Sequence, residues 1–148
     1  MAGMDERSGF CGRVIERVGT IFEPRRLAVA VAVTLAMLVT THIPQQMMPP
    51  SLDVALLDKL EHVLAYGAVV FLWLLSFRRP PGLKAMAGVV LAAAALGAVD
   101  ELTQPLVNRT ACPVDWAADL VGAVMACGLF GLVRHCRRER LLRSALEA

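Results

Sequence analysis

The sequence has very little charge along its long apolar stretches. Residues 27–39 contain no charged side chain and a single hydroxyl group, that of Thr34. A helix of a soluble bundle carries a polar face beside its apolar stripe, so this stretch argues against a soluble all-α bundle. The composition agrees, because 57% of the 148 residues are hydrophobic and only 5% are aromatic, with a mean hydropathy of +0.58. Such a profile is far from that of a soluble domain.

Cysteine and histidine are also scarce, with four and three residues. In the topology derived below, Cys11 and Cys136 fall on one side of the membrane, Cys127 within it and Cys112 on the other side, so we expect no disulfide. The cysteines lack the spacing of a metal site, and no second histidine lies at helical spacing from His62. No serine or cysteine neighbours His62 in sequence, which leaves nucleophilic catalysis unsupported. We therefore expect no metal ion and no other cofactor.

Four apolar segments are candidates for membrane spans: residues 27–43, 60–77, 83–99 and 116–133. Each has 17 or 18 residues, the lower end of what crosses a bilayer core of roughly 30 Å. The turn at 78–82 is so short that the second and third segments form an antiparallel hairpin. The sequence therefore predicts an all-α polytopic membrane protein with four transmembrane helices in an up-down-up-down bundle.

The basic residues are distributed unevenly around these segments. Thirteen of the fifteen lysines and arginines lie before the first segment, between the second and third or at the start of the third (Lys84), or after the fourth. Because basic residues gather on the cytoplasmic side, we expect both termini in the cytoplasm. The expected organisation is a cytoplasmic segment at 1–26, a transmembrane domain at 27–133 and a basic cytoplasmic tail at 134–148. The bilayer is the expected partner, and nucleic acid is not.

Two regions outside the spans have a less definite pattern. Phe10, Val14 and Val18 recur at helical spacing opposite Arg13 and Arg17, which favours an amphipathic helix on the inner membrane surface. Glycines in the same region favour a partly ordered tail instead. The segment 134–148 is expected to be a helix in solvent or on the membrane surface.

Ionisable residues open the second segment on a single helix face. At 100° per residue, Asp58, His62, Tyr66 and Lys59 fall at about 0°, 40°, 80° and 100°. Charges within a membrane helix are costly and usually serve a function. His42, by contrast, stands alone in sequence at the end of the first segment, and we expect it to be incidental.

In an up-down-up-down bundle, the start of the second segment, the end of the third and the loop into the fourth meet at one membrane boundary. The polar residues at these three places are Asp58, Lys59, Glu61, His62, Tyr66, Asp100, Glu101, Gln104, Arg109, Asp115 and Asp119. Their spacing falls into three blocks: Asp58-Lys59-x-x-His62 with Tyr66, Asp100-Glu101-x-x-Gln104, and Arg109 followed at six, ten and thirteen residues by Asp115, Asp119 and Gly122.

Taken together, the three blocks resemble the VanZ-like family of small integral membrane proteins, over roughly residues 58–131. The resemblance implies a multi-pass protein of the bacterial plasma (inner) membrane, linked to low-level resistance to the glycopeptide teicoplanin. It implies no settled biochemical activity, so the resemblance supplies a phenotype rather than a mechanism.

Six carboxylates in this set face one lysine and one arginine, and like charges in a partly dehydrated site cannot all stay ionised without compensation. The compensation is internal pairing with a proton on Asp119 or Glu101, a bound cation, or a positively charged substrate. A purely structural version pairs Lys59 with Glu101 or Asp100 and Arg109 with Asp115, so that the set only locks the helix ends together.

A functional version takes His62 as general acid or base, oriented by Asp58 or Glu101, and these three are the catalytic candidates. Lys59 and Arg109 would hold a phosphate or carboxylate of an outer-leaflet lipid head group or cell-wall precursor. The remaining binding candidates are Tyr66, Asp100, Gln104, Asp115 and Asp119.

The same residues are compatible with a metal site of His62, Asp100 and Glu101, and the four spans are compatible with a small dimeric exporter. A scaffold that binds another membrane protein through the small-residue face of the third segment is a further hypothesis. The sequence leaves the oligomeric state open.

Overall fold

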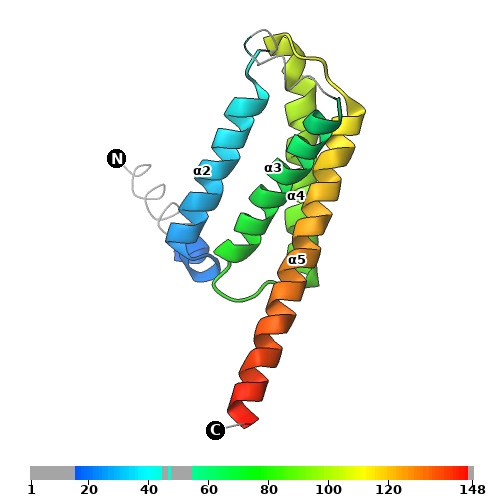
Figure 1. The fold of residues 1–148 in the computed structure, drawn as a ribbon. Helices are drawn as coiled ribbons and strands as arrows, with labels where there is room; N and C mark the ends of the chain where they lie inside the picture. Colours follow the sequence, from blue (N-terminus) through cyan, green and yellow to red (C-terminus); the bar gives the residue numbers. More distant parts are fainter. Residues whose placement is uncertain (1–15, 45–46, 48–54, 147–148) are drawn as a thin grey trace, which may run out of the picture.

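The computed structural model describes residues 16–44, 47 and 55–146, which form helices joined by short connections. The long helices are α2 (Pro24–Thr41), α3 (Ala55–Ser76), α4 (Leu83–Thr103) and α5 (Pro113–Leu146), and the 3₁₀ helix η3 (Gln104–Val107) follows α4. Successive long helices run in opposite directions, so α2 and α4 end where α3 and α5 begin (Figure 1). The predicted all-α, four-helix arrangement is confirmed for this part of the chain.

All four long helices are long and apolar enough to cross a membrane. At 1.5 Å per residue, the 21 residues of α4 extend about 32 Å, one bilayer core. Large apolar side chains such as Leu35, Leu64 and Leu91 point outward and are 58%, 63% and 70% exposed. An outer surface of this kind suits lipid rather than water, so the helices indicate a membrane-embedded protein.

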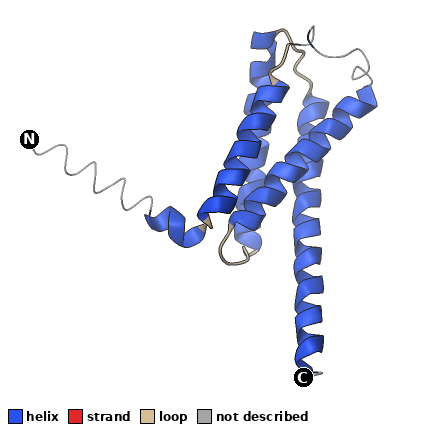
Figure 2. Ribbon diagram, turned by 60° about the vertical axis from the view of Figure 1, so that its left-hand side comes forward, coloured by secondary structure: helices blue, strands red, loops and turns tan. Residues whose placement is uncertain are grey.

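Helix α5 is much longer than a single span requires. Its 34 residues extend about 51 Å, and its second half projects beyond the other helices (Figures 1 and 2). Residues 131–146 are exposed throughout. The tail, which the sequence predicted as a helix in solvent or on the membrane surface, is helical as far as Leu146 and continues the fourth span without a break.

The helix boundaries differ from the expected ones where polar groups extend a helix. Helix α2 begins at Pro24 because the Glu23 carboxylate caps it, accepting from the amides of Arg25 (3.3 Å) and Arg26 (2.8 Å). The Arg26 hydrogen bond is the main reason that the pKa of Glu23 lies below its ordinary value. Helix α4 runs past the expected end at residue 99 and passes into η3, where Pro105 occupies the first turn.

The interior lies mainly between α3 and α5. Helix α3 buries Tyr66, Val69, Val70 and Leu74, and its closest partner is the small-residue face of α5. Buried Gly122 sits so near α3 that a Cβ there would collide with the backbone carbonyl of Val63. Small residues at such a seam let two membrane helices approach closely.

The segment before α2 packs on the turn between α3 and α4. The ring of Phe22 contacts that of Phe77 in a tilted arrangement at a centroid distance of 4.6 Å and meets Trp73 edge-on at 6.3 Å. The Arg78 amide donates to the Ile21 carbonyl at 2.9 Å. Residues 16–21 are helical, while most of the predicted amphipathic segment at 1–26 lies outside the described residues.

Candidate functional site

Polar side chains gather at the end of the bundle where α2 and α4 end and α3 and α5 begin. We call this group the polar cup: Thr41, His42, Asp58, Lys59, His62, Tyr66, Asp100, Glu101, Thr103, Gln104, Arg109, Asp115 and Asp119. It contains all ten residues that the sequence predicted for the site. The structure therefore brings the predicted set together, although several partners within it differ from those expected.

His62 of α3 and Asp119 of α5 form the most buried pair of the cup. The His62 Nδ1 atom lies 2.9 Å from Asp119 Oδ1, and the two residues are 5% and 1% exposed. A carboxylate at Nδ1 fixes the ring and leaves Nε2 available to exchange a proton with a ligand. The expected orienting groups, Asp58 or Glu101, were wrong, because the turn of α5 that follows Asp115 presents Asp119 to the ring instead.

Lys59 joins α3 to α5 at the rim of the cup. Its ammonium group lies 2.8 Å from Asp58 Oδ2 and also contacts Asp115 Oδ1, and its side chain is 28% exposed. The expected pairing with Glu101 or Asp100 was wrong, since both of those acids come from α4 and face other partners. Lys59 is therefore already occupied by two carboxylates.

Glu101 is held by donors on both of its oxygens. Gln104 Nε2 donates to Oε1 at 3.0 Å, and the Cys112 amide donates to Oε2 at 2.8 Å. Glu101 is 6% exposed, so these hydrogen bonds offset part of the cost of burying the carboxylate. They also tie the end of α4 to the loop that leads into α5.

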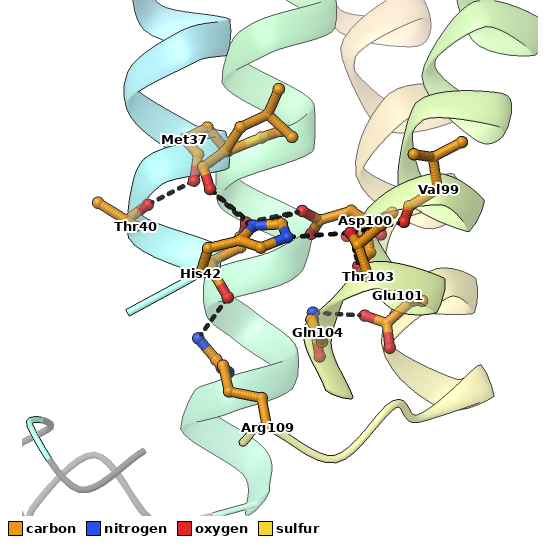
Figure 3. Close-up of polar contacts among 12 residues, drawn as sticks. Met37, Thr40, His42, Val99, Asp100, Glu101, Thr103, Gln104 and Arg109 are labelled. Atoms are coloured by element: carbon orange, nitrogen blue, oxygen red, sulfur yellow. Dashed lines mark hydrogen bonds and ion pairs between the residues drawn. The ribbon is translucent and has the colours of Figure 1, made fainter. Parts of the chain in front are cut away.

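A second histidine, His42, belongs to the cup, although the sequence did not predict it as a site residue. Figure 3 shows its ring turned toward Asp100 and Thr103, with Nδ1 donating to the Leu38 carbonyl (2.9 Å) and Nε2 paired with Thr103 Oγ1 (2.9 Å). Its Nδ1 also lies 3.4 Å from Asp100 Oδ1, to which Thr41 Oγ1 donates at 2.8 Å. The expectation that His42 is incidental was wrong, because α2 and α4 end side by side although their residues are far apart in sequence.

Arg109 reaches across the cup from the loop after η3. Its Nη1 atom donates to the Thr41 carbonyl at 3.0 Å (Figure 3), rather than to Asp115 as the sequence suggested. Asn108, just before it, adopts a left-handed conformation with φ of 58°, which asparagine tolerates better than most residues. This turn directs the guanidinium back toward α2.

Tyr66 and Asp119 leave polar atoms without partners deep in the cup. The Tyr66 hydroxyl and Asp119 Oδ2 are buried and have no hydrogen-bond partner among the described residues. Both border the space above Gly97, where a Cβ would lie 2.9 Å from Asp119 Oδ2 and 3.4 Å from the Tyr66 oxygen. Gly97 therefore belongs to the wall of the cup rather than to a free outer face of α4.

A small cavity of about 20 Å³ opens beside these residues, with room for about one water molecule. Asp58, His62, Tyr66 and Arg109 line it, together with Glu61, which is exposed at the rim. The cavity therefore connects the buried histidine to the arginine and to two carboxylates.

Among the described residues, two sets of side chains could hold a metal ion: His62, Glu101 and Asp119, and Asp58, His62 and Asp115. In each set, one donor atom from every residue lies within 4.8 Å of the others. Lys59 already supplies positive charge to the second set. The first set offers one imidazole and two carboxylates, which suit a divalent transition metal, whereas Asp100, the third ligand suggested by the sequence, faces Thr41 and His42.

Comparison with models of known protein families, with curated proteins and with solved structures finds no match to this chain. The likeness to the VanZ-like family therefore rests on the three sequence blocks, and the chemistry of the cup has to be argued from its own residues.

Proposed function

We propose that this chain is a VanZ-like integral membrane protein whose polar cup binds the head group of an envelope lipid or of a lipid-linked cell-wall precursor. Binding of this ligand would change susceptibility to glycopeptides such as teicoplanin. One observation supports this above the others: three segments distant in sequence bring a buried His62–Asp119 pair, an arginine and several carboxylates to one end of a bundle of apolar helices. Ionisable groups buried within a bundle of apolar membrane helices usually mark a functional site.

The positions of Arg109 and His62 suggest how a head group is held. One nitrogen of Arg109 is used by the Thr41 carbonyl. The rest of the guanidinium is partly exposed beside the small cavity, so that it can bind a phosphate or carboxylate at the open rim of the cup, outside the space for one water molecule. His62, oriented by Asp119, can exchange a proton with the same ligand. Asp58 and Glu61 at the cavity accept hydrogen bonds from hydroxyl or amino groups of the head group.

An apolar groove below the cup supports a lipid-linked ligand. The groove has a volume of about 460 Å³ and lies among α2, α3 and α4. Its lining includes Val69 and Leu96, each about one helical turn from the cup residues Tyr66 and Asp100. A ligand with its head group in the cup can therefore place an acyl or isoprenoid chain in the groove.

The proposed orientation puts the cup on the outer side of a bacterial plasma membrane, with both termini in the cytoplasm. The opposite end of the bundle carries Arg25 and Arg26 at the start of α2, Arg78 and Arg79 before α4, and a run of arginines along the second half of α5. Such an accumulation is typical of the cytoplasmic side. Cysteine labelling from outside the cell tests this in a chain whose native cysteines are replaced by serine, with Asn108→Cys expected to react and Ser144→Cys expected not to react.

Teicoplanin tolerance tests the proposal in a host where the protein changes it. We expect His62→Ala and Arg109→Ala to abolish the change while membrane levels stay as in the wild type. The matched controls His135→Ala and Arg138→Ala, both on the exposed part of α5, should keep it. Unchanged tolerance in both cup variants would refute the proposal.

A structural role is the second candidate, favoured by the contacts of Lys59 with Asp58 and Asp115, which fasten α3 to α5. Ligand binding separates the two candidates. A lipid-linked precursor added to purified protein should raise the unfolding temperature if the cup binds it, and His62→Ala should remove that rise. A purely structural cup gives no rise in either protein.

Gly88 of α4, where an added Cβ would meet nothing within 4 Å, also lines the apolar groove. Gly88→Leu therefore tests the scaffold hypothesis together with the cup variants: a scaffold loses its effect in Gly88→Leu and keeps it in His62→Ala and Arg109→Ala. Gly97 does not serve this purpose, because enlarging it also disturbs Asp119 and Tyr66.

A further inference from the structure

A second pocket lies at the end of the bundle opposite the cup. It has a volume of about 400 Å³ and is formed by the start of α2, the end of α3, the turn after α3 and the middle of α5. Phe71, Leu74, Leu75, Phe130 and Val133 form its apolar wall. Four arginines complete the lining: Arg26, Arg78, Arg134 and Arg137.

Three of the four arginines donate to backbone carbonyls. Arg78 Nε donates to the carbonyls of Gly19 (2.6 Å) and Phe22 (2.9 Å). Arg26 and Arg134 each donate from Nη1, at 3.4 Å, to the carbonyls of Leu75 and Pro81. These bonds orient the guanidinium groups of Arg26, Arg78 and Arg134 without neutralising them.

Very little negative charge faces these four groups. Within the described part of the chain, their one carboxylate partner is Glu23, 4.0 Å from Arg26 Nε at an exposed position. The carboxylate of Glu23 is also shared with two backbone amides. The pocket therefore keeps a strong excess of positive charge beside an apolar wall.

The depth of the arginines matches the head-group region of a membrane. Arg134 follows Pro113, the first residue of α5, by 21 residues, which is about 32 Å of helix. This distance equals roughly one hydrocarbon core. Phe71, Leu74 and Phe130 then lie at acyl-chain level, and the guanidinium groups lie where lipid phosphates are.

We propose that this pocket binds an anionic phospholipid, with its phosphate held by Arg134 and Arg137 and its acyl chains against the apolar wall. Guanidinium groups bind phosphate oxygens in pairs, and basic pockets between transmembrane helices recognise anionic head groups. A free phosphate ion would use the arginines but not the apolar wall, so the two-part lining selects a lipid. This site is independent of the polar cup and of the ligand proposed there.

Native mass spectrometry of the full chain in detergent tests the site, with phosphatidylglycerol and phosphatidylcholine as probes. The wild type should bind phosphatidylglycerol in preference to phosphatidylcholine. Arg134→Gln/Arg137→Gln should weaken phosphatidylglycerol binding about 25-fold, or about fivefold for each charge removed near a membrane surface. The matched control Arg138→Gln/Arg140→Gln removes the same charge from the same helix outside the pocket and should change binding less than about threefold.

Three results would overturn the proposal: equal weakening in both double variants, equal binding of the two lipids by the wild type, or displacement of phosphatidylglycerol by inorganic phosphate at the same concentration. Arg134→Gln removes the link to Pro81, so gel filtration and the unfolding temperature must first show a folded protein. If the double variant does not fold, Arg137→Gln alone carries the test, with an expected loss of about fivefold.

Discussion

The contact between Gly122 and α3 makes a sharp test of the fold. We expect Gly122→Ala to destabilise the bundle, because the added methyl group would collide with the Val63 carbonyl and lie 3.0 Å from the Gly67 backbone nitrogen. Both neighbours belong to the helix backbone and cannot rotate away as a side chain could. The helices must therefore separate, and the buried residues around the seam lose part of their packing.

The magnitude follows from two opposing effects. Overpacking a tight interior costs about 1–3 kcal/mol, whereas replacing glycine by alanine within a helix gains about 0.5–1 kcal/mol. We expect a net loss of about 1–2 kcal/mol. Gly128→Ala is the matched control on the same helix, because a Cβ there meets nothing within 4 Å. It should leave stability unchanged or raise it by up to about 1 kcal/mol.

Reversible unfolding in mixed micelles, followed by circular dichroism at increasing dodecyl sulfate fraction, measures both variants under the same conditions. If Gly122→Ala proves as stable as Gly128→Ala, α3 and α5 do not meet at this seam. The register that aligns the cup residues on these two helices would then be wrong as well.

Three further predictions use other contacts. His42→Ala should lower the free energy of unfolding by about 1–2 kcal/mol in the same assay, because its hydrogen bonds to Leu38 and Thr103 are removed. His135→Ala should leave the free energy of unfolding unchanged. Trp73→Phe should lose about 1 kcal/mol with its 3.1 Å hydrogen bond to Thr34, and adding Thr34→Val should cost less than the two single losses combined. The pKa of Glu23 lies below its ordinary value of 4.5, so its carboxylate stabilises α2 fully above pH 4.5, and this stabilisation is lost as the pH falls through the lowered pKa. The NMR chemical shift of the Arg26 amide should follow this titration, and Glu23→Gln should abolish the pH dependence of that shift.

The sequence predicted which residues meet but not how they pair. Apolar segment lengths defined the four helices, and helical periodicity placed His62 and Tyr66 on one face, where both are buried. Because successive helices run in opposite directions, the three blocks of polar residues, which are far apart in sequence, come together at one end of the bundle. These steps depend on local pattern and on topology alone.

Pairing within the cup depends on how each helix is rotated about its axis, which the local pattern of one helix does not define. Lys59 was assigned to acids of α4, yet its partners are its neighbour Asp58 and Asp115 of α5. His42 gave no signal, because its partners Asp100 and Thr103 become neighbours only when α2 and α4 end at the same level.

The register between α3 and α5 explains the pairing. These two helices run in the same direction from the cup (Figure 1), and their contacts advance together along the chain. Lys59 meets Asp115 and His62 meets Asp119, and one turn later Gly122 meets the backbone of Val63 and Gly67. The steps on α5 are four and three residues, and on α3 the contacts pass from Lys59 to His62 and then to the backbone of the turn between Val63 and Gly67, as expected for one face of each helix.

The glycine seam and the charged pairs are consequently parts of one interface. Gly122 sets how closely the helix axes approach, and that approach decides whether Asp119 reaches the His62 ring one turn above. A bulkier residue at the seam should therefore weaken the His62–Asp119 hydrogen bond without touching either side chain. Gly122→Ala should thus also shift the His62 ring resonances in NMR spectra, and Gly128→Ala, which leaves the seam intact, should not.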